Sequence, residues 1–192
     1  MKTALIAAFC CAASLVLPIA HAQGLKFKAG ELADYQARAE SGEPKAQVVL
    51  AQYYLLTLGK EKDPLEGIRW ARKAAAQNEA EAQVLLAGCY MSGDGVEKDL
   101  KEAMRWYRKA AEQNHVMGQF GLGVGYSKGL GMEKDEKEAY AWLSLAARAQ
   151  ADAAVFRDRL EKQFSTEQLA DAKQRTEVLR AQIEARLKKG GK

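Results

Sequence analysis

Apolar and aromatic positions recur with a period of 36 residues through the middle of the chain. The tryptophans follow this spacing, and so do a leucine, a tyrosine, an aspartate and a glutamine in each repeat. The recurring sets are Leu50, Leu86 and Leu122; Tyr54, Tyr90 and Tyr126; Trp70, Trp106 and Trp142; Asp63, Asp99 and Asp135; and Gln47, Gln83 and Gln119. A fixed period of this length is typical of a repeat protein whose stacked repeats share one continuous core.

The pattern predicts two helices in each repeat. In the second repeat, Ala82, Leu86 and Tyr90 are spaced four residues apart, so they lie on one face of a helix. The glycine loop at residues 93–95 ends this helix, and Asp99 stands where it can cap the next one. Because an aspartate recurs before each second helix, we interpret these residues as N-caps and not as catalytic carboxylates.

Shorter helical patterns flank the three repeats. Residues 30–41 match the second helix of a half repeat, the kind of N-terminal cap that stacked repeats need. After the repeats, the pattern predicts a helix from Ala151 to Gln163 and another that begins at Ser165, where Gln168 completes a capping box. The apolar positions of this last helix are Leu169, Ala172, Leu179, Ile183 and Leu187. We interpret it as a cap for the repeats; the alternative is a helix that binds a partner or forms a coiled coil.

The first 22 residues have the features of a secretory signal peptide. Lys2 precedes an apolar run over residues 4–17, Pro18 follows it, and Ala20-His21-Ala22 forms a cleavage site of small residues. The run is shorter than the roughly 20 residues that span a bilayer, so we expect no membrane span. We expect cleavage after Ala22 and a periplasmic protein. The chain then divides into a signal peptide (1–22), an N-terminal half repeat (23–41), three repeats (42–77, 78–113 and 114–150) and a C-terminal helical extension (151–189).

Composition excludes several classes of site. Removal of the signal peptide leaves Cys89 and His115 as the only cysteine and histidine. One of each cannot form a disulfide or a structural zinc site, so we expect no metal and no cofactor. Residues 23–150 carry 18 basic and 18 acidic side chains, which gives no basic stripe for nucleic acid. Cys89 fits a small buried thiol, with an exposed thiol as the alternative; the repeated tryptophans fit a core, with a sugar-binding ladder as the alternative.

Glycines crowd the first helix of the third repeat. Four of them fall within eight residues: Gly118, Gly121, Gly123 and Gly125. Each glycine inside a helix costs about 0.5–1 kcal/mol relative to alanine, so the local sequence opposes the helix that the period demands. Two explanations remain open. The glycines either permit close helix packing or leave a groove beside Phe120 and Val124.

The second repeat resembles the Sel-one-like repeat, a relative of the tetratricopeptide repeat. The matching pattern is Ala82-Gln83-x-x-Leu86-Ala87-x-x-Tyr90-x-x-Gly93-x-Gly95-Val96-x-x-Asp99-x-x-x-Ala103-x-x-Trp106-Tyr107-x-Lys109-Ala110-Ala111. The first repeat departs from it at Thr57-Leu58, and the third at Leu143 and Ser144. The resemblance implies an all-α fold: a right-handed α/α solenoid of helix-pair repeats, with an N-terminal half repeat and C-terminal capping helices.

The resemblance also implies a function. The first helices of such a solenoid line a concave face that binds another protein or a peptide, and the register places ten candidate residues there. They are Lys45, Val48, Gln52, Leu55, Glu81, Val84, Met91, Met117, Phe120 and Val124. An apolar centre with a polar rim is typical of a protein-binding surface, although we expect about half of these side chains to pack against neighbouring helices instead.

We therefore expect a periplasmic interaction module, an adaptor or regulatory scaffold, and not an enzyme. One alternative is an immunity protein that neutralises a secreted toxin in the periplasm. Another is a binder of cell-wall glycan or peptide. A hydrolase like the β-lactamase-related members of the family is disfavoured, because no serine here is followed by lysine three residues on. The oligomeric state stays open.

Overall fold

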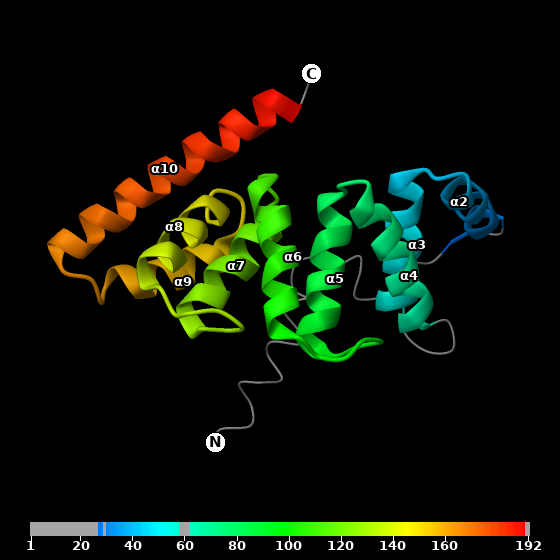
Figure 1. Cartoon of the computed structure of the whole chain (residues 1–192), viewed down its shortest axis with the longest axis horizontal. Helices are drawn as coiled ribbons and strands as arrows, with labels where there is room; N and C mark the ends of the chain where they lie inside the picture. The colour runs from blue at the N-terminus through cyan, green and yellow to red at the C-terminus, as the bar shows by residue number, and fades with distance from the viewer. Residues whose placement is uncertain (1–26, 29, 58–61, 191–192) are drawn as a thin grey trace. The chain divides into compact units, whose positions relative to one another are not determined.

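The computed structural model describes residues 27–28, 30–57 and 62–190 (Figure 1). Over these residues the backbone forms nine α-helices, α2 to α10, and no strand. The prediction of an all-α fold is confirmed. The expected signal peptide lies outside the described residues, as does the 58–61 loop of the first repeat. The chain separates into two compact parts, the N-terminal unit Met1–Lys98 and the C-terminal unit Asp99–Lys192.

Four helices build the described part of the N-terminal unit, and each packs on the next along the chain. They are α2 (Glu31–Glu40), α3 (Pro44–Leu56), α4 (Pro64–Ala76) and α5 (Ala80–Ser92). The leucines and the tryptophan of the 36-residue pattern, Leu50, Trp70 and Leu86, are buried between them. Gly67 allows α3 and α4 to approach closely, because a Cβ atom there would lie 2.6 Å from Cγ of Leu55.

The turns between repeats share one conformation. Gly42, Asn78 and Asn114 all have positive φ angles, 99°, 68° and 64°. This left-handed conformation suits glycine and, less well, asparagine. The recurring glutamines stabilise the two asparagine turns: Gln83 Nε2 donates to Asn78 Oδ1 at 3.2 Å, and Gln119 Nε2 to Asn114 Oδ1 at 3.0 Å. These buried glutamines therefore fix the turns that begin the second and third repeats.

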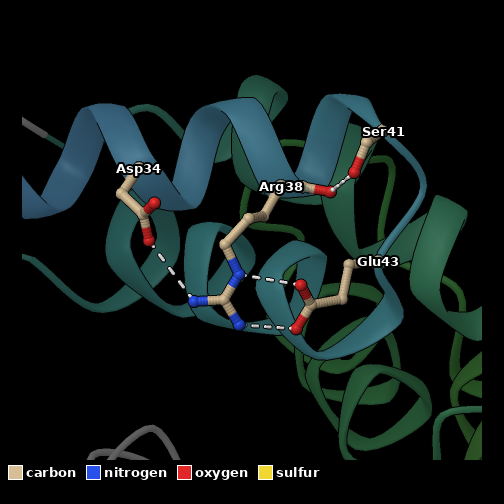
Figure 2. Close-up of polar contacts among 4 residues, drawn as sticks. All are labelled: Asp34, Arg38, Ser41 and Glu43. Carbon is tan, nitrogen blue, oxygen red and sulfur yellow. Dashed lines mark hydrogen bonds and ion pairs between the residues drawn. The ribbon is translucent and has the colours of Figure 1, made fainter.

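At the Gly42 turn, polar side chains also join the end of α2 to the start of α3 (Figure 2). The Arg38 guanidinium donates twice to the Glu43 carboxylate, at 2.7 and 2.6 Å, and once to Asp34 at 3.3 Å. Ser41 Oγ donates to the Arg38 carbonyl at 2.7 Å. The cation lowers the pKa of the Glu43 carboxyl. The half repeat predicted at residues 30–41 is thus a real helix, α2, joined to the first repeat by charged side chains.

Five helices build the C-terminal unit. They are α6 (Leu100–Glu112), α7 (Val116–Lys128), α8 (Glu136–Ala146), α9 (Ala151–Glu161) and α10 (Thr166–Gly190). Helix α7 packs between α6 and α8, while α9 and the long α10 both pack on α8 (Figure 1). The predicted capping box is present at the start of α10, where Ser165 and Gln168 exchange hydrogen bonds of 2.9 and 3.2 Å.

The glycines of α7 permit close helix packing. A Cβ atom on Gly118 would lie 2.5 Å from the backbone nitrogen of Ala111 in α6. The space beside Gly121 and Gly125 is occupied by Tyr107 and Met104 of α6, and that beside Gly123 by Leu143 of α8. The groove interpretation is therefore wrong, because neighbouring helices fill the space that the missing side chains leave.

Aspartate caps open the second helices, as the sequence predicts. The Asp99 carboxylate accepts hydrogen bonds from the backbone nitrogens of Lys101 and Glu102 at 2.9 and 3.0 Å. Asp63 accepts at 3.1 Å from the nitrogen three residues on, and Asp135 accepts at 3.0 Å from the nitrogens two and three residues on. Each carboxylate satisfies amide groups that a helix start leaves without a partner.

Candidate partner-binding surfaces

In the N-terminal unit, the predicted binding residues lie on two first helices, α3 and α5, which pack against each other. Gln52 Nε2 of α3 donates to Glu81 Oε1 of α5 and joins the two helices. Val48 and Leu55 of α3 are buried, with exposed fractions of 5% and 7%. Lys45 is exposed at the start of α3. On α3 the apolar candidates thus belong to the core, Gln52 is buried as well, and of the four α3 candidates Lys45 is the exposed one.

Helix α5 presents an open apolar surface. Val84, Gly88 and Met91 follow each other at intervals of four and three residues, so they share one helix face. All three are partly exposed. A Cβ atom added to Gly88 would meet nothing within 4 Å. We name these three residues the α5 patch; its centre has room for an incoming side chain.

In the C-terminal unit, the predicted stripe on α7 is largely covered. Phe120 and Val124 are buried, with exposed fractions of 8% and 1%, and Met117 is partly exposed. The ring of Phe120 packs edge-on against Phe156 of α9, with centroids 5.7 Å apart. Phe156 stands 36 residues after Phe120, so α9 takes the place of the first helix of a further repeat. The 36-residue spacing between the two phenylalanines is the sequence signal for this contact.

Five of the ten predicted residues are therefore buried: Val48, Gln52, Leu55, Phe120 and Val124. The other five remain at least partly accessible: Lys45, Glu81, Val84, Met91 and Met117. The structure brings Gln52 and Glu81 into direct contact. The accessible apolar part of the predicted face in the N-terminal unit is the α5 patch.

Of the two residues that could support catalysis, Cys89 is buried and His115 stands at the start of α7. Cys89 is buried, with 6% exposed, and burial, aided by the charge of Asp94, raises the pKa of its thiol to about 12. A thiol with such a pKa is a poor nucleophile at neutral pH. His115 is the N-cap residue of α7. Within the described residues, no group of histidine, cysteine, aspartate or glutamate side chains could hold a metal ion.

The tryptophans lie in or against the core. Trp70 and Trp142 are buried, with exposed fractions of 2% and 3%. Trp106 is partly buried, and the Lys109 ammonium lies 4.0 Å from its ring centre. Arg69 and Lys73 cover Trp70 in the same way, at 4.3 and 4.5 Å. The core interpretation of Trp70 and Trp142 is confirmed.

A family model matches the repeats. The model described as Sel1 repeat matches three successive segments, residues 44–79, 80–115 and 116–150. The chain belongs to the Sel1 repeat family. The resemblance stated from the sequence and the predicted helix-pair repeat class are confirmed. Each matched segment begins two residues after the start assigned from the sequence pattern.

Solved structures of other Sel1 repeat proteins have the same fold. A protective antigen of uropathogenic Escherichia coli with an SLR fold has a TM-score of 0.76 and 33% identity, over 85% of this chain and 36% of that chain. A Sel1 repeat protein from Oxalobacter formigenes has a TM-score of 0.60 and 35% identity, over 68% of this chain and 98% of that one. Cysteine rich protein B of Helicobacter pylori has a TM-score of 0.53 and 25% identity, over 67% and 99%. Among curated proteins, none matches significantly.

Family membership constrains the function. Sel1 repeat proteins generally mediate protein–protein interactions, and their fold is generally a scaffold without catalytic activity. This chain spans about a third of the length of the E. coli antigen. It also differs from a cysteine-rich protein, because Cys89 is the one cysteine of its described part and is not in a disulfide. In the described residues, no helix is long and apolar enough to cross a membrane.

Proposed function

We propose that this protein is a periplasmic adaptor that holds a partner protein on the faces of its first helices. The observation that carries the proposal is the α5 patch, where Val84 and Met91 flank open space above Gly88. Apolar side chains that flank open space can receive an anchoring side chain of a partner, the contact that dominates many interfaces. Methionine adapts its shape to such an anchor.

The surroundings of the patch support the same function. Glu81 lies one turn before Val84 and is exposed. It gives one edge of the apolar patch a charged group, as in the polar rim of a protein-binding surface. The partner in this proposal is a folded protein or a peptide with an apolar anchor.

The proposed periplasmic location is supported by residues 1–22. Their single positive charge, apolar run and Ala20-His21-Ala22 site combine the three parts of a cleavable export signal. An exported adaptor would meet its partners in the cell envelope. Cys89, the one cysteine left after removal of residues 1–22, is buried and is not in a disulfide.

Crosslinking in the native cell envelope tests this function. The tagged full-length chain is expressed, crosslinked and purified, and the proteins enriched with it are identified. Gly88→Trp should abolish enrichment of the partner, since the indole would fill the space above α5. Gly88→Ala is the matched control, because one methyl group leaves most of the space open and should leave capture intact.

Two results would overturn the proposal. If Gly88→Trp captures the same protein at the same yield, the α5 patch is not the binding surface. If no protein is enriched with the unaltered chain, the adaptor function itself fails. Capture of a secreted toxin whose activity this chain suppresses would identify the immunity role, while the buried Trp70 and Trp142 argue against a tryptophan ladder for glycan.

A further inference from the structure

A hollow on the surface of the C-terminal unit lies away from the predicted first-helix face. Its volume is about 220 Å³. It is lined by Lys101, Met104, Arg105 and Arg108 of α6 and by Gly131 and Met132 of the α7–α8 loop. Small-molecule sites usually measure about 300–1,000 Å³, so this hollow has the size for one side chain and not for a cofactor.

The hollow has more cationic than anionic groups. Lys101, Arg105 and Arg108 are spaced four and three residues apart, so they lie along one side of α6. Arg105 pairs with Glu102 at 3.1 Å. Arg108 donates to the Tyr126 hydroxyl at 2.6 Å, which orients the guanidinium without neutralising it. The Lys101 ammonium forms no ion pair with any residue that the structure describes. Two positive charges are left uncompensated.

The corresponding place on α8 does receive a carboxylate. The lysine 36 positions after Lys101 is Lys137, which pairs with Asp171 of α10 at 2.5 Å. The hollow on α6 therefore lacks an anion that the chain supplies at the equivalent lysine of the next repeat.

The apolar part of the hollow narrows the choice of ligand. Met104 is buried, with 2% exposed, and Met132 is partly buried. The partly accessible Met132 side chain beside cations suits a carboxylate that is attached to an apolar segment, whereas a free phosphate would gain nothing from it. Arginine also binds carboxylates well, because its planar group offers paired donors.

We infer that this hollow binds an aspartate or glutamate side chain of the partner protein, next to an apolar residue of that partner. The inference rests on the proposed function, since it takes the ligand to be a protein. The partner would then contact α6, the second helix of its repeat, in addition to the α5 patch.

Methionine methyl groups report on this site directly. Met104 and Met132 line the hollow, while Met91 and Met117 belong to the predicted first-helix face. The full chain is labelled with ¹³C at its methionine methyl groups and titrated with the acetylated peptide amide Leu-Glu-Leu-Glu. The matched probes are Leu-Gln-Leu-Gln and inorganic phosphate. We expect the acidic peptide to shift the signals of Met104 and Met132, and the glutamine peptide to leave them unchanged.

Two variants on α6 test the charge. Lys101→Glu should weaken binding of the acidic peptide by about tenfold or more, because it replaces an attractive charge by a repulsive one. Lys101→Arg should retain binding. Lys109→Glu is the matched control on the same helix, because the Lys109 ammonium lies over Trp106 and is not part of the hollow.

Three other results overturn the inference, each in a distinct way. Equal binding of phosphate means a site for free anions, and equal binding of the glutamine peptide means an apolar contact alone. No shift up to about 10 mM peptide means that the hollow has no such ligand. Loss of partner capture in the crosslinking experiment, with the Met104 and Met132 shifts intact, would contradict the adaptor function while leaving this acidic-group site in place.

Discussion

Arg175 of α10 donates its Nε–H to the Glu138 carboxylate of α8. In α4 and α6, the equivalent glutamates bind an arginine of their own helix three residues on: Glu66 pairs with Arg69, and Glu102 with Arg105. Helix α8 has Ala141 at the position of those arginines. The arginine for its glutamate comes instead from α10.

Helix α10 also provides the contacts of the apolar surface of α8. Lysines cover the tryptophans of α4 and α6, whereas α8 has Leu145 at the corresponding position. Ala141, Trp142 and Leu145 form one buried cluster with Leu179 and Ile183 of α10. The outer face of the third repeat is thus specialised to receive the C-terminal helix. The interpretation of this helix as a cap is supported: its buried apolar contacts extend to Ile183, and Arg186 pairs with Glu112 of α6, while Leu187 is 45% exposed.

Truncation of the α10 contact should destabilise the C-terminal unit. Leu179 is 4% exposed, and its neighbour Val178, on the other side of the helix, is 40% exposed. Leu179→Ala should lower the free energy of unfolding by about 2–5 kcal/mol, because it leaves a cavity in the cluster. Val178→Ala should change it by no more than about 0.5 kcal/mol. Urea unfolding followed by circular dichroism measures both; equal effects would mean that α10 does not dock through Leu179.

Replacing each of two helical glycines by alanine should change the stability of the protein in opposite directions. At Gly88 a Cβ atom meets nothing within 4 Å, so Gly88→Ala should stabilise the protein by about 0.5–1 kcal/mol through helix propensity. At Gly118 the added atom would lie 2.5 Å from the Ala111 backbone, so Gly118→Ala should destabilise by about 1–3 kcal/mol. Thermal unfolding of the two variants compares them, and a stabilised Gly118→Ala would refute the close approach of α6 and α7.

The Cys89 thiol should be protected in the native protein. Because the side chain is buried, a thiol reagent at pH 8 should react with it about 100-fold more slowly than in denaturant, the factor set by an opening free energy of about 2.8 kcal/mol. Ellman's reagent provides the rates in the two conditions. Rapid reaction of the folded protein would place the thiol at the surface.

The same thiol should make stability fall at alkaline pH. Its pKa is raised from 9.0 to about 12, so the unfolded thiol ionises first and the native one keeps its proton. The stabilising contribution is complete below pH 9 and is lost as the pH rises toward about 12. Cys89→Ala removes this contribution, and the difference between the urea curves of the two proteins from pH 8 to about 10.5 isolates it from lysine and tyrosine titration.

Export should remove the first 22 residues. N-terminal sequencing of the protein from the periplasmic fraction is expected to begin at Gln23, since the small residues Ala20 and Ala22 precede that bond. Ala22→Pro should block cleavage and leave the longer chain in the membrane fraction. Recovery of the uncleaved chain from the cytoplasm of unaltered cells would contradict the proposed location.

Local signals were read correctly from the sequence because their hydrogen bonds join residues close together in the chain. Asp99 caps a helix two and three residues away, and Ser165 and Gln168 complete a capping box within one turn. The 36-residue period likewise predicted the helix pairs, since stacking the same helix faces requires the same spacing in every repeat.

Accessibility within the predicted first-helix face could not be read in this way. Val84 and Phe120 stand at the same register position, yet Val84 is partly exposed while Phe120 is covered by Phe156 of α9. The period assigns a side chain to a face. It does not state which later helix returns to cover that face.

The sequence by itself determined the repeat, the helix pairs, the aspartate caps and the family, because each depends on local hydrogen bonds or on a regular spacing. Only the tertiary structure decided that Met104, Tyr107 and Leu143 occupy the space beside the α7 glycines. It also decided that Arg175 of α10 binds Glu138 of α8. Those contacts join separate helices, and their fit depends on the shape and distance of the neighbouring helix, which no periodic pattern encodes.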